Sequence, residues 1–280
     1  MAPCGQIRTN REVFFRPVSF QRDRPSARDT QNQYARQAER YAESSLHRRG
    51  ESLDTVRRLA AATGEDTVLD LGTGTGFTAF AVAADAGRVI AADLTPEMLE
   101  QARRLARERD LEAEVEWTLA AAESLPFADD SIPVITCRYA SHHFHDLPRA
   151  LRELARVIQP RGRVVLCDVV APEAPGLTEL MNELEQVRDP THIWDYPLSQ
   201  WRQDLLPAAG LEVRDVVRGK NPQLFSEWVH RAGTPPEAVQ RLVQMFTTAS
   251  EEARRAFEVR REGAELIFSW PIATILATKR

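Results

Sequence analysis

The stretch that decides the fold reads Thr67-Val-Leu-Asp-Leu-Gly-Thr-Gly-Thr-Gly76. Its apolar start is typical of a short strand that is buried on both faces. Three glycines in five residues follow, and an apolar helical pattern then runs to Ala83. Glycine permits a tight turn and a close approach of the backbone to a ligand, and the next helix points free N–H groups back at that ligand. The stretch therefore predicts a nucleotide-type binding corner.

The spacing of the glycines indicates which ligand fits. Dinucleotide-binding turns have the spacing G-x-G-x-x-G. This chain instead has G-x-G-x-G from Gly72 to Gly76, and Asp70 stands two residues before the first glycine. A carboxylate there would repel a pyrophosphate and attract a cation. The turn resembles the first motif of class I S-adenosylmethionine-dependent methyltransferases, an acid followed by x-G-x-G-x-G. The resemblance implies that S-adenosylmethionine, which carries an ammonium and a sulfonium, is bound by Asp70, Gly72, Thr73, Gly74 and Gly76.

A second strand, predicted at residues 88–93, ends in an acid. Asp93 follows the turn at close to the spacing of about 20 residues at which an acid reaches ribose hydroxyls in nucleotide-binding folds. Thr95 and Pro96 then predict the start of a helix. In the resembled family, the residue after the acid and an apolar residue of this helix flank the adenine, and here these are Leu94 and Met98. Core packing is the alternative for Met98.

The segment Ala120-Ala-Ala-Glu-Ser-Leu-Pro-Phe127 is similar to the family's G-D-A-E-x-L-P-F. The family aspartate holds the adenine amino group, and Ala121 stands at its position here. The loss of that acceptor would weaken binding by about 1–2 kcal/mol unless Glu123 or the backbone replaces it. The resemblance further implies that the N–H of Ala122 faces the adenine.

A strand predicted at residues 132–137 ends at Cys137 and leads into Arg138-Tyr-Ala-Ser-His-His-Phe-His145. This segment resembles the family's x-x-x-L-H-H-F/W. Ligands of open α/β sheets bind beyond the carboxyl ends of the strands, so we expect Cys137 beside the cofactor and Arg138 in the substrate pocket. No metal site is expected, because adjacent histidines rarely ligate one ion together. For His142 and His143 the alternatives are a structural bond to backbone and a general base, and within the second we prefer His143.

The order of elements predicts the architecture. Strands that alternate with helices through short connections indicate an α/β fold, a Rossmann-like doubly wound sheet. Residues 156–166, R-V-I-Q-P-R-G-R-V-V-L, match the family's R-V-L-K-P-G-G-R-L-L-L, and the resemblance covers roughly residues 30–217. It implies seven strands with the last one antiparallel. A small helical cap is expected at about 219–262, before a last strand at 267–278 that Pro271 should bend or place at an edge.

The N-terminal part divides into two expected segments. Residues 1–28 are rich in arginine and proline without periodicity, which predicts a flexible leader before a methyltransferase domain at 29–280. Helices are predicted from Asp29 and at 52–62. In the resembled family such helices close over the cofactor and often carry a tyrosine near the substrate. The candidate pocket residues are Tyr34, Tyr41 and His47 here, and His192 further along; packing of the tyrosines against the sheet is the alternative.

Composition narrows the class of function. The chain is 43% hydrophobic and 28% charged, which is ordinary for a globular protein, and no apolar run approaches the ~20 residues that span a bilayer. Three scattered cysteines predict neither a disulfide framework nor zinc and fit a reducing, cytoplasmic setting. A net charge of −5 argues against a nucleic-acid substrate.

These observations predict a methyltransferase that uses S-adenosylmethionine and transfers the methyl group in line to oxygen or carbon of a small-molecule acceptor. The chain is similar to the ubiquinone/menaquinone-biosynthesis C-methyltransferases, so a quinone is one option. Two alternatives stay open. One is a non-catalytic protein that binds S-adenosylmethionine, suggested by Ala121. The other is an NAD(P)-dependent oxidoreductase, disfavoured by the glycine spacing and by the lack of a Tyr-x-x-x-Lys pair. The sequence does not fix the oligomeric state.

Overall fold

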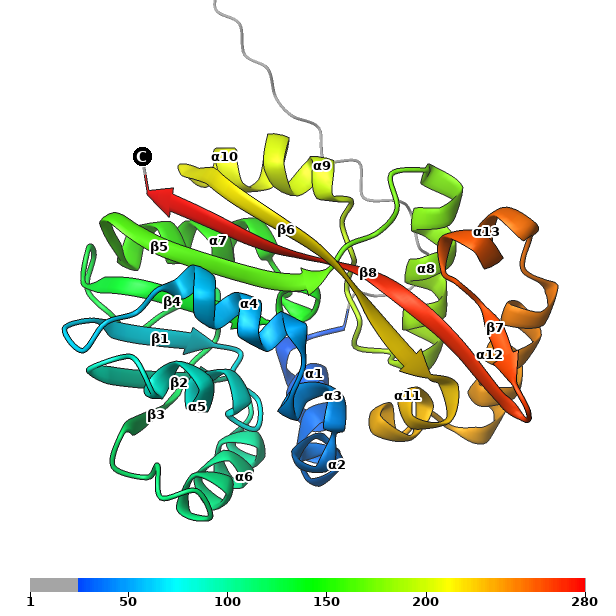
Figure 1. Ribbon diagram of the computed structural model, residues 1–280, viewed down its shortest axis with the longest axis horizontal. Coiled ribbons are helices and arrows are strands. Elements are labelled where there is room, and N and C mark those ends of the chain that lie inside the picture. The colour runs from blue at the N-terminus through cyan, green and yellow to red at the C-terminus, as the bar shows by residue number, and fades with distance from the viewer. Residues whose placement is uncertain (1–24, 280) are drawn as a thin grey trace, which may run out of the picture.

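The computed structural model describes residues 25–279, apart from the side chains of residues 45 and 46. Figure 1 shows a twisted sheet with helices on both faces, and further helices beside the far ends of its two longest strands. The strands are β1 (Thr67–Leu71), β2 (Arg88–Asp93), β3 (Val115–Leu119), β4 (Ile132–Arg138), β5 (Ile158–Val169), β6 (Leu211–Leu224), β7 (Arg260–Glu262) and β8 (Glu265–Lys279).

Across the sheet the strands follow the order β3-β2-β1-β4-β5-β8-β6, and the short β7 pairs with β8. Strands β1 to β5 are parallel to one another, whereas β8 is antiparallel to β5 and β6. The predicted Rossmann-like, doubly wound sheet with an antiparallel last strand is therefore confirmed, with β7 as an addition. Its parallel strands end at one edge, where ligands of such sheets bind.

Helices cover both faces of the sheet (Figure 1). One face packs against α4 (Glu51–Ala60), α5 (Phe77–Ala83) and α6 (Pro96–Arg107). The other packs against α7 (Leu147–Val157) and a helical run made of α9 (Leu198–Gln200), a π-helical turn (Trp201–Leu205) and α10 (Leu206–Ala208). Thr95 precedes α6 as predicted, but its side chain makes no cap hydrogen bond.

Helix α7 illustrates why these segments are helical. The Asp146 carboxylate accepts a hydrogen bond from the Arg149 backbone N–H at 2.9 Å, and Pro148 stands in the first turn, where its missing N–H costs nothing. Buried apolar residues then recur at helical spacing, including Leu151 and Leu154. Each fully buried leucine contributes about 1.5–3 kcal/mol to folding, so packing on the sheet supplies most of the stability of α7.

The hairpin of β6 and β8 is longer than predicted. The two strands pair without a gap from Val217↔Thr274 to Leu224↔Ile267, so the sequence-based boundary of the cap at residue 219 is wrong by several residues. Gly219 and Pro222 do not interrupt the ladder. The cap consists of α11 (Phe225–Ala232), α12 (Pro236–Thr248) and α13 (Glu251–Ala256), which share an apolar cluster with α8 (Pro175–Arg188). Aromatic residues such as Trp228 and Phe246 therefore form the core of the cap.

Pro271 does not place β8 at an edge, because β8 lies between β5 and β6. Its carbonyl accepts the Val170 N–H at 3.0 Å, so the missing N–H of Pro271 faces the β5 side. The pairing of β8 with β5 ends at the next residue, Ile272, opposite Val169. Pro271 therefore lacks a backbone N–H just beyond the point where the pairing of β8 with β5 ends, so no hydrogen bond between these strands is lost.

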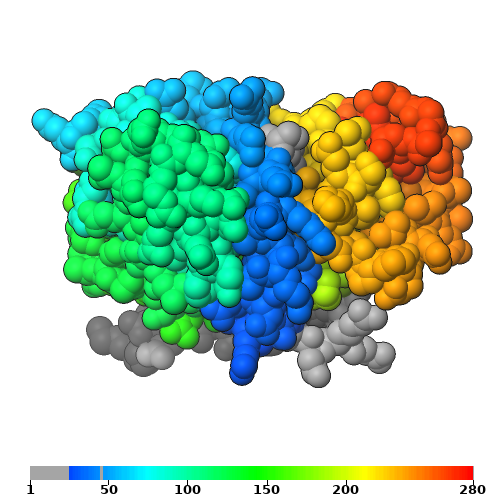
Figure 2. All heavy atoms as spheres, turned by 90° about the horizontal axis from the view of Figure 1, so that it is seen from below, coloured from blue at the N-terminus to red at the C-terminus, as the bar shows by residue number. Residues whose placement is uncertain are grey.

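Three short helices begin the described chain: α1 (Ala27–Ala35), α2 (Ala38–Glu43) and α3 (Ser45–Arg48). Ser26 and Asp29 form a capping box, in which each side chain accepts the backbone N–H of the other, so α1 begins two residues before the predicted start. Most of the expected leader lies outside the described residues. In Figure 2 the blue N-terminal residues lie between the green and cyan part of the sheet domain and the yellow and orange residues that include the cap.

Side-chain amides fasten these helices on both sides. Gln31 donates to the carbonyl of Leu94 at 3.1 Å, after β2, and Gln33 donates to the carbonyl of Ala232 at 3.2 Å, at the end of α11. Gln37 donates to the same Ala232 carbonyl. In the part of the chain that the structure describes, no helix has the length and apolarity needed to cross a membrane.

Candidate functional site

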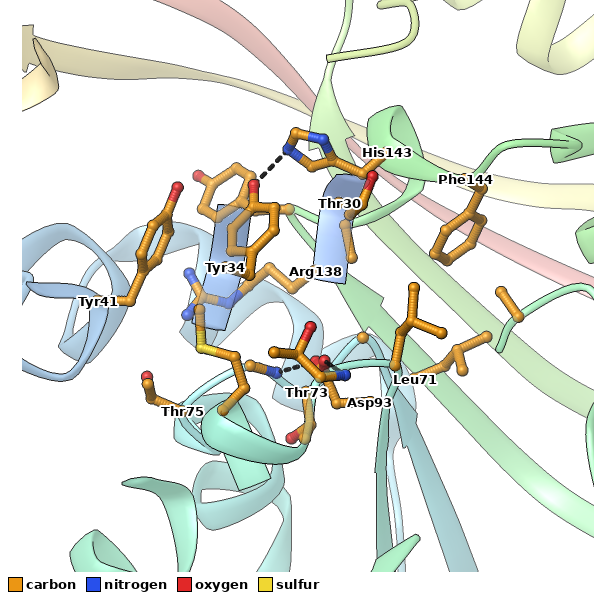
Figure 3. Close-up of a pocket in the computed structure, with 18 of the residues that line it drawn as sticks. Thr30, Tyr34, Tyr41, Leu71, Thr73, Thr75, Asp93, Arg138, His143 and Phe144 are labelled. Carbon is orange, nitrogen blue, oxygen red and sulfur yellow. Dashed lines mark hydrogen bonds between the residues drawn. The ribbon is translucent and has the colours of Figure 1, made fainter. Parts of the chain in front are cut away.

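A cavity lies at the carboxyl ends of β1, β2 and β4, beside α1 and α2 (Figure 3). It contains about 900 Å³ of empty space, including space open to solvent. The glycine turn, the ends of these strands, the loop after β4 and the tyrosines of the N-terminal helices line it.

The glycines of the turn serve different purposes. All three have positive φ: +64° at Gly72, +53° at Gly74 and +89° at Gly76. A Cβ at Gly72 would lie 2.4 Å from the Cβ of Ala140, and one at Gly76 would lie 2.7 Å from the Phe80 ring. A Cβ at Gly74 would meet nothing within 4 Å. Gly72 and Gly76 are thus required by packing, whereas Gly74 leaves the cavity free.

Asp70 holds the turn from behind. It is 1% exposed, and its carboxylate accepts hydrogen bonds from the hydroxyls of Thr73 at 2.6 Å and Thr136 at 2.7 Å. Burial raises the pKa of Asp70 to about 6, and the two hydroxyls limit the rise. Thr73 lines the cavity and Asp70 does not. Asp70 therefore contacts the turn instead of the cavity.

Asp93 at the end of β2 lines the cavity. One carboxylate oxygen accepts the N–H of Gly74 at 2.7 Å and the other accepts the N–H of Thr95 at 2.9 Å. Burial raises the pKa of Asp93, and these N–H groups oppose the rise. A carboxylate offers about four acceptor positions, and the place of Asp93 in the cavity lining makes it available to hydroxyl groups of a ligand.

His143 and Tyr34 form a pair at the other end of the cavity. The Tyr34 hydroxyl lies 2.5 Å from Nε2 of His143, whose Nδ1 lies 3.2 Å from the carbonyl of Thr191 (Figure 3). A carbonyl only accepts, so Nδ1 carries the proton, and Nε2 accepts from Tyr34. Burial, followed by the charge of His142, lowers the pKa of His143, so this imidazole is neutral. Burial raises the pKa of Tyr34 well above its usual value.

His142 faces away from the cavity and pairs with Asp168. Nδ1 of His142 lies 2.7 Å from the carboxylate, which also accepts from the Ser141 hydroxyl at 2.5 Å and the Val169 N–H at 2.8 Å. Burial lowers the pKa of His142, but the charge of Asp168 and the hydrogen bond outweigh burial and raise it to about 9. The same pair lowers the pKa of Asp168. The ion pair fixes the turn that carries His143.

Comparisons with known proteins identify the family. The sequence model of a protein family described as a methyltransferase domain matches residues 69–166 of this chain. The chain is 39% identical over 224 residues to the uncharacterized methyltransferase YcgJ of Bacillus subtilis strain 168, and the alignment covers 80% of this chain and 88% of YcgJ. The chain belongs to the S-adenosylmethionine-dependent methyltransferases. This membership favours an enzyme over the non-catalytic and oxidoreductase alternatives.

Solved structures of methyltransferases agree with this conclusion. The crystal structure of YcgJ has a TM-score of 0.78 and 38% identity, covering 82% of this chain and 98% of YcgJ. A putative methyltransferase of Bacillus halodurans C-125 has a TM-score of 0.77 and 30% identity, covering 82% and 99%. A shorter match, 39% over 121 residues, links 43% of this chain to 48% of the demethylmenaquinone methyltransferase of Clavibacter sepedonicus. The methyl donor is therefore S-adenosylmethionine.

The structure brings most of the predicted site residues of this methyltransferase together. The predicted cofactor residues that line the cavity are Gly72, Thr73, Gly74, Asp93, Leu94, Met98, Ala122 and Glu123. Those outside its lining are Asp70, Gly76 and Cys137. Cys137 packs into the apolar cluster beneath α7, because the strand alternates its side chains between the two faces.

The predicted acceptor residues divide in the same way. Tyr34, Tyr41, Arg138, His143 and also His47 line the cavity, whereas His142 and His192 lie behind it. His192 is 2% exposed, and its Nε2 lies 2.9 Å from the Asn182 side-chain oxygen. Residues that the sequence reasoning missed include Thr30 and Phe144. Thr30 lies one helical turn before Tyr34, so its position on the same helix face was the available signal.

Gly72→Ala and Gly74→Ala should separate stability from donor binding. The Cβ of Gly72→Ala meets Ala140 at 2.4 Å in a backbone conformation that disfavours alanine, so the free energy of unfolding should fall by about 2 kcal/mol or more. Gly74→Ala carries only the φ strain, about 1–2 kcal/mol, but its methyl group enters the cavity and should weaken donor binding at least tenfold. Urea unfolding and calorimetric titration measure the two effects. Equal stability losses with unchanged affinity would contradict these roles.

The ion pair of His142 with Asp168 predicts a pH dependence of stability. The pKa of His142 is about 9 in the fold and about 6.5 when unfolded, so the pair stabilises the fold below pH ~6.5 and loses this contribution as the pH rises through 9. The full contribution is about 3 kcal/mol, of which about 2 kcal/mol should disappear between pH 6.5 and 8.5. Urea unfolding at both pH values measures it. His142→Gln should remove this slope, and an unchanged slope would contradict the pairing.

Proposed function

We propose that this methyltransferase acts on a small-molecule acceptor and transfers the methyl group to an oxygen or to an acidic carbon. The observation that carries the proposal is the pair of a neutral His143 and the Tyr34 hydroxyl at the cavity. Such a pair accepts a proton from a group that must lose one when it is methylated. Amine acceptors have no need of this pair if they bind in their neutral form.

The donor end of the cavity is proposed to hold S-adenosylmethionine through its own side chains and backbone. The Asp93 carboxylate would accept from the ribose hydroxyls, and Leu94 and Met98 would flank the adenine. The N–H of Ala122 would face the adenine, since Ala121 offers no side-chain acceptor. Open space at Gly74 and the position of the Asp93 carboxylate in the cavity lining support this placement.

His143 acts as the base through Tyr34 in this proposal. The acceptor hydroxyl donates to the Tyr34 oxygen, while the Tyr34 hydrogen is already directed at Nε2 of His143. When the acceptor oxygen or carbon is methylated, its proton passes to Tyr34 and the Tyr34 proton passes to His143. The donor supplies an activated methyl group on a sulfonium, which becomes a neutral thioether when the methyl group is transferred. Burial and the charge of His142 oppose protonation of His143. The positive charge that His143 gains compensates for the sulfonium charge that is lost on methyl transfer.

The chemistry of the pair favours an acceptor with an acidic hydroxyl, such as a phenol or an enol. A relative named ubiquinone/menaquinone biosynthesis C-methyltransferase, 38% identical over 109 residues, supports carbon as one destination of the methyl group. A ring carbon beside a phenolic hydroxyl needs the same removal of a proton. The net charge of −5 supports a small molecule over a nucleic acid.

A panel of acceptors tests the proposal. The purified protein is incubated with S-adenosylmethionine labelled in its methyl group and with phenols, hydroquinones, enols and primary amines of similar size. We expect label in the phenolic, hydroquinone or enol products, with one S-adenosylhomocysteine formed per methyl transferred. Transfer to amines alone would overturn the proposed acceptor class. Titration with S-adenosylmethionine, S-adenosylhomocysteine and NAD provides the control, because only the first two should bind.

A further inference from the structure

Arg138 is a buried cation on the wall of the cavity. It is 7% exposed, and its guanidinium donates to the Thr78 hydroxyl at 3.0 Å, the Ser52 hydroxyl at 3.3 Å and the carbonyl of His47 at 2.6 Å. These acceptors are all neutral oxygens. Within residues 25–279, side chains of 45 and 46 aside, no carboxylate forms an ion pair with Arg138. The charge of Arg138 acts on Asp70 behind the turn, but a buried guanidinium without a directly paired acid is costly in free energy unless a ligand supplies one.

The hydrogen bonds of Arg138 leave donors for a ligand. A guanidinium has five N–H groups, and Nε, Nη1 and Nη2 each make one of the contacts above. One N–H therefore remains on each of Nη1 and Nη2. Two such N–H groups form the fork that binds both oxygens of a carboxylate. The ring of Tyr139, 5.0 Å from the guanidinium carbon, holds the plane of the group.

The surroundings of Arg138 favour an anion. His47, whose carbonyl Arg138 contacts, has its pKa lowered well below the usual value by burial and then by the charges of Arg231, Arg138 and Arg188. Arg188 has Glu185 as its ion-pair partner at 3.0 Å. Arg231 donates to Gln223, a neutral side chain, at 2.8 Å. Glu185 and Asp189 act on Arg188, and Glu185 and Glu227 act on Arg231, whereas Arg138 has no acid in direct contact within the described residues.

The position of the guanidinium indicates which ligand brings the carboxylate. Thr78 belongs to the first turn of α5, directly after the glycine turn. Figure 3 shows Arg138 between Tyr34 and Tyr41 on one side and Thr73 and Thr75 on the other. The group therefore lies beside the turn that is proposed to receive the donor.

We propose that Arg138 binds the carboxylate of the methionine part of S-adenosylmethionine. This assignment differs from the expectation that Arg138 belongs to the acceptor pocket. It rests on the identity of the methyl donor, not on the proposed acceptor. The Arg138 fork and the Asp93 carboxylate would then bind opposite ends of the donor and fix the direction of the methyl group between them.

Calorimetric titration of the wild type and Arg138→Gln with two donors tests the assignment. One donor is S-adenosylmethionine, and the other is its decarboxylated form, which keeps the amino group, the sulfonium and the adenosine. The wild type should prefer the carboxylated donor by about 100-fold, as expected for a bidentate charged pair. Arg138→Gln should bind both donors within about threefold of each other. Arg138→Lys should recover part of the preference, because it keeps the charge and loses the fork.

Two controls keep the result interpretable. Arg57→Gln removes an exposed arginine that pairs with Asp85 and should leave the preference unchanged. Binding of 5′-methylthioadenosine, which lacks the methionine carboxylate, should be equal in the wild type and in Arg138→Gln and so reports that the variant is folded. Failure of the wild type to bind either donor would instead contradict the identity of the donor.

An Arg138→Gln variant that still prefers the carboxylated donor would overturn the assignment. If that variant also loses the binding of benzoate that the donor-loaded wild type shows, Arg138 would be assigned to a carboxylate of the acceptor.

Discussion

Replacing His143 by glutamine is expected to lower kcat for a hydroxyl acceptor by about 100-fold or more, the usual contribution of a general base. Glutamine can still accept the hydrogen bond of Tyr34, so the geometry is kept while the basic nitrogen is lost. The affinity for S-adenosylmethionine should stay within about threefold, because His143 lies at the end of the cavity away from Asp93. Steady-state kinetics with an acceptor from the panel, and calorimetry with the donor, measure the two quantities.

Tyr34→Phe should produce a similar loss, since it removes the hydroxyl that lies between the acceptor and His143. The double variant should lose little more than either single variant, because two groups that act in one proton path are not additive. His230→Gln, on α11, serves as the matched histidine control. An acceptor that is already ionised at the assay pH should restore turnover to both variants. Failure of such an acceptor to rescue them would favour a structural role.

Asp93→Ala is expected to weaken binding of S-adenosylmethionine by roughly a thousandfold. Each hydrogen bond from a ribose hydroxyl to this carboxylate is worth about 1.5–3 kcal/mol, and two of them account for about 4 kcal/mol. The variant also releases the N–H groups of Gly74 and Thr95, which loosens the turn. Asp93→Asn keeps one acceptor and should lie between the two proteins. Calorimetric titration measures the affinities.

A matched control for Asp93 is Asp85→Ala. Asp85 lies just after α5 and pairs with Arg57 on the surface, so its loss should leave donor affinity unchanged. Near-wild-type affinity of Asp93→Ala would remove this carboxylate from the ribose site. A melting temperature recorded for each variant separates lost binding from lost folding.

The parts of the molecule that the sequence predicted are local in the chain. The turn at Gly72 to Gly76 and the acid at Asp93 belong to motifs whose geometry follows from a few neighbouring residues, so both were placed correctly at the edge of the sheet. The long hairpin was missed because the pairing of Leu224 with Ile267 joins residues far apart in sequence. Gly219 and Pro222 favoured a break that this pairing overrides.

The different roles of neighbouring side chains could not be predicted from the sequence either. His142 and His143 are adjacent in a short 3₁₀ turn, Ser141–His143. A turn of three residues has no hydrophobic periodicity that would predict which histidine side chain points into the cavity. The charge of Asp168 and the position of Tyr34 decide it. Likewise, Arg138 could be placed near the cavity from the loop motif, but the lack of an ion-pair partner for it within the described chain is a property of the tertiary structure.

The hydrogen bonds that hold α1 and α2 to two neighbouring parts of the protein have a consequence for the turnover rate of the enzyme. Gln31 binds the loop after β2 at Leu94, which lines the cavity, while Gln33 and Gln37 bind the end of α11. Each cycle must exchange spent S-adenosylhomocysteine for a fresh donor. We expect this exchange to require movement of α1 away from Leu94, so that the frequency of the movement would limit the number of cycles per second, whichever acceptor is used.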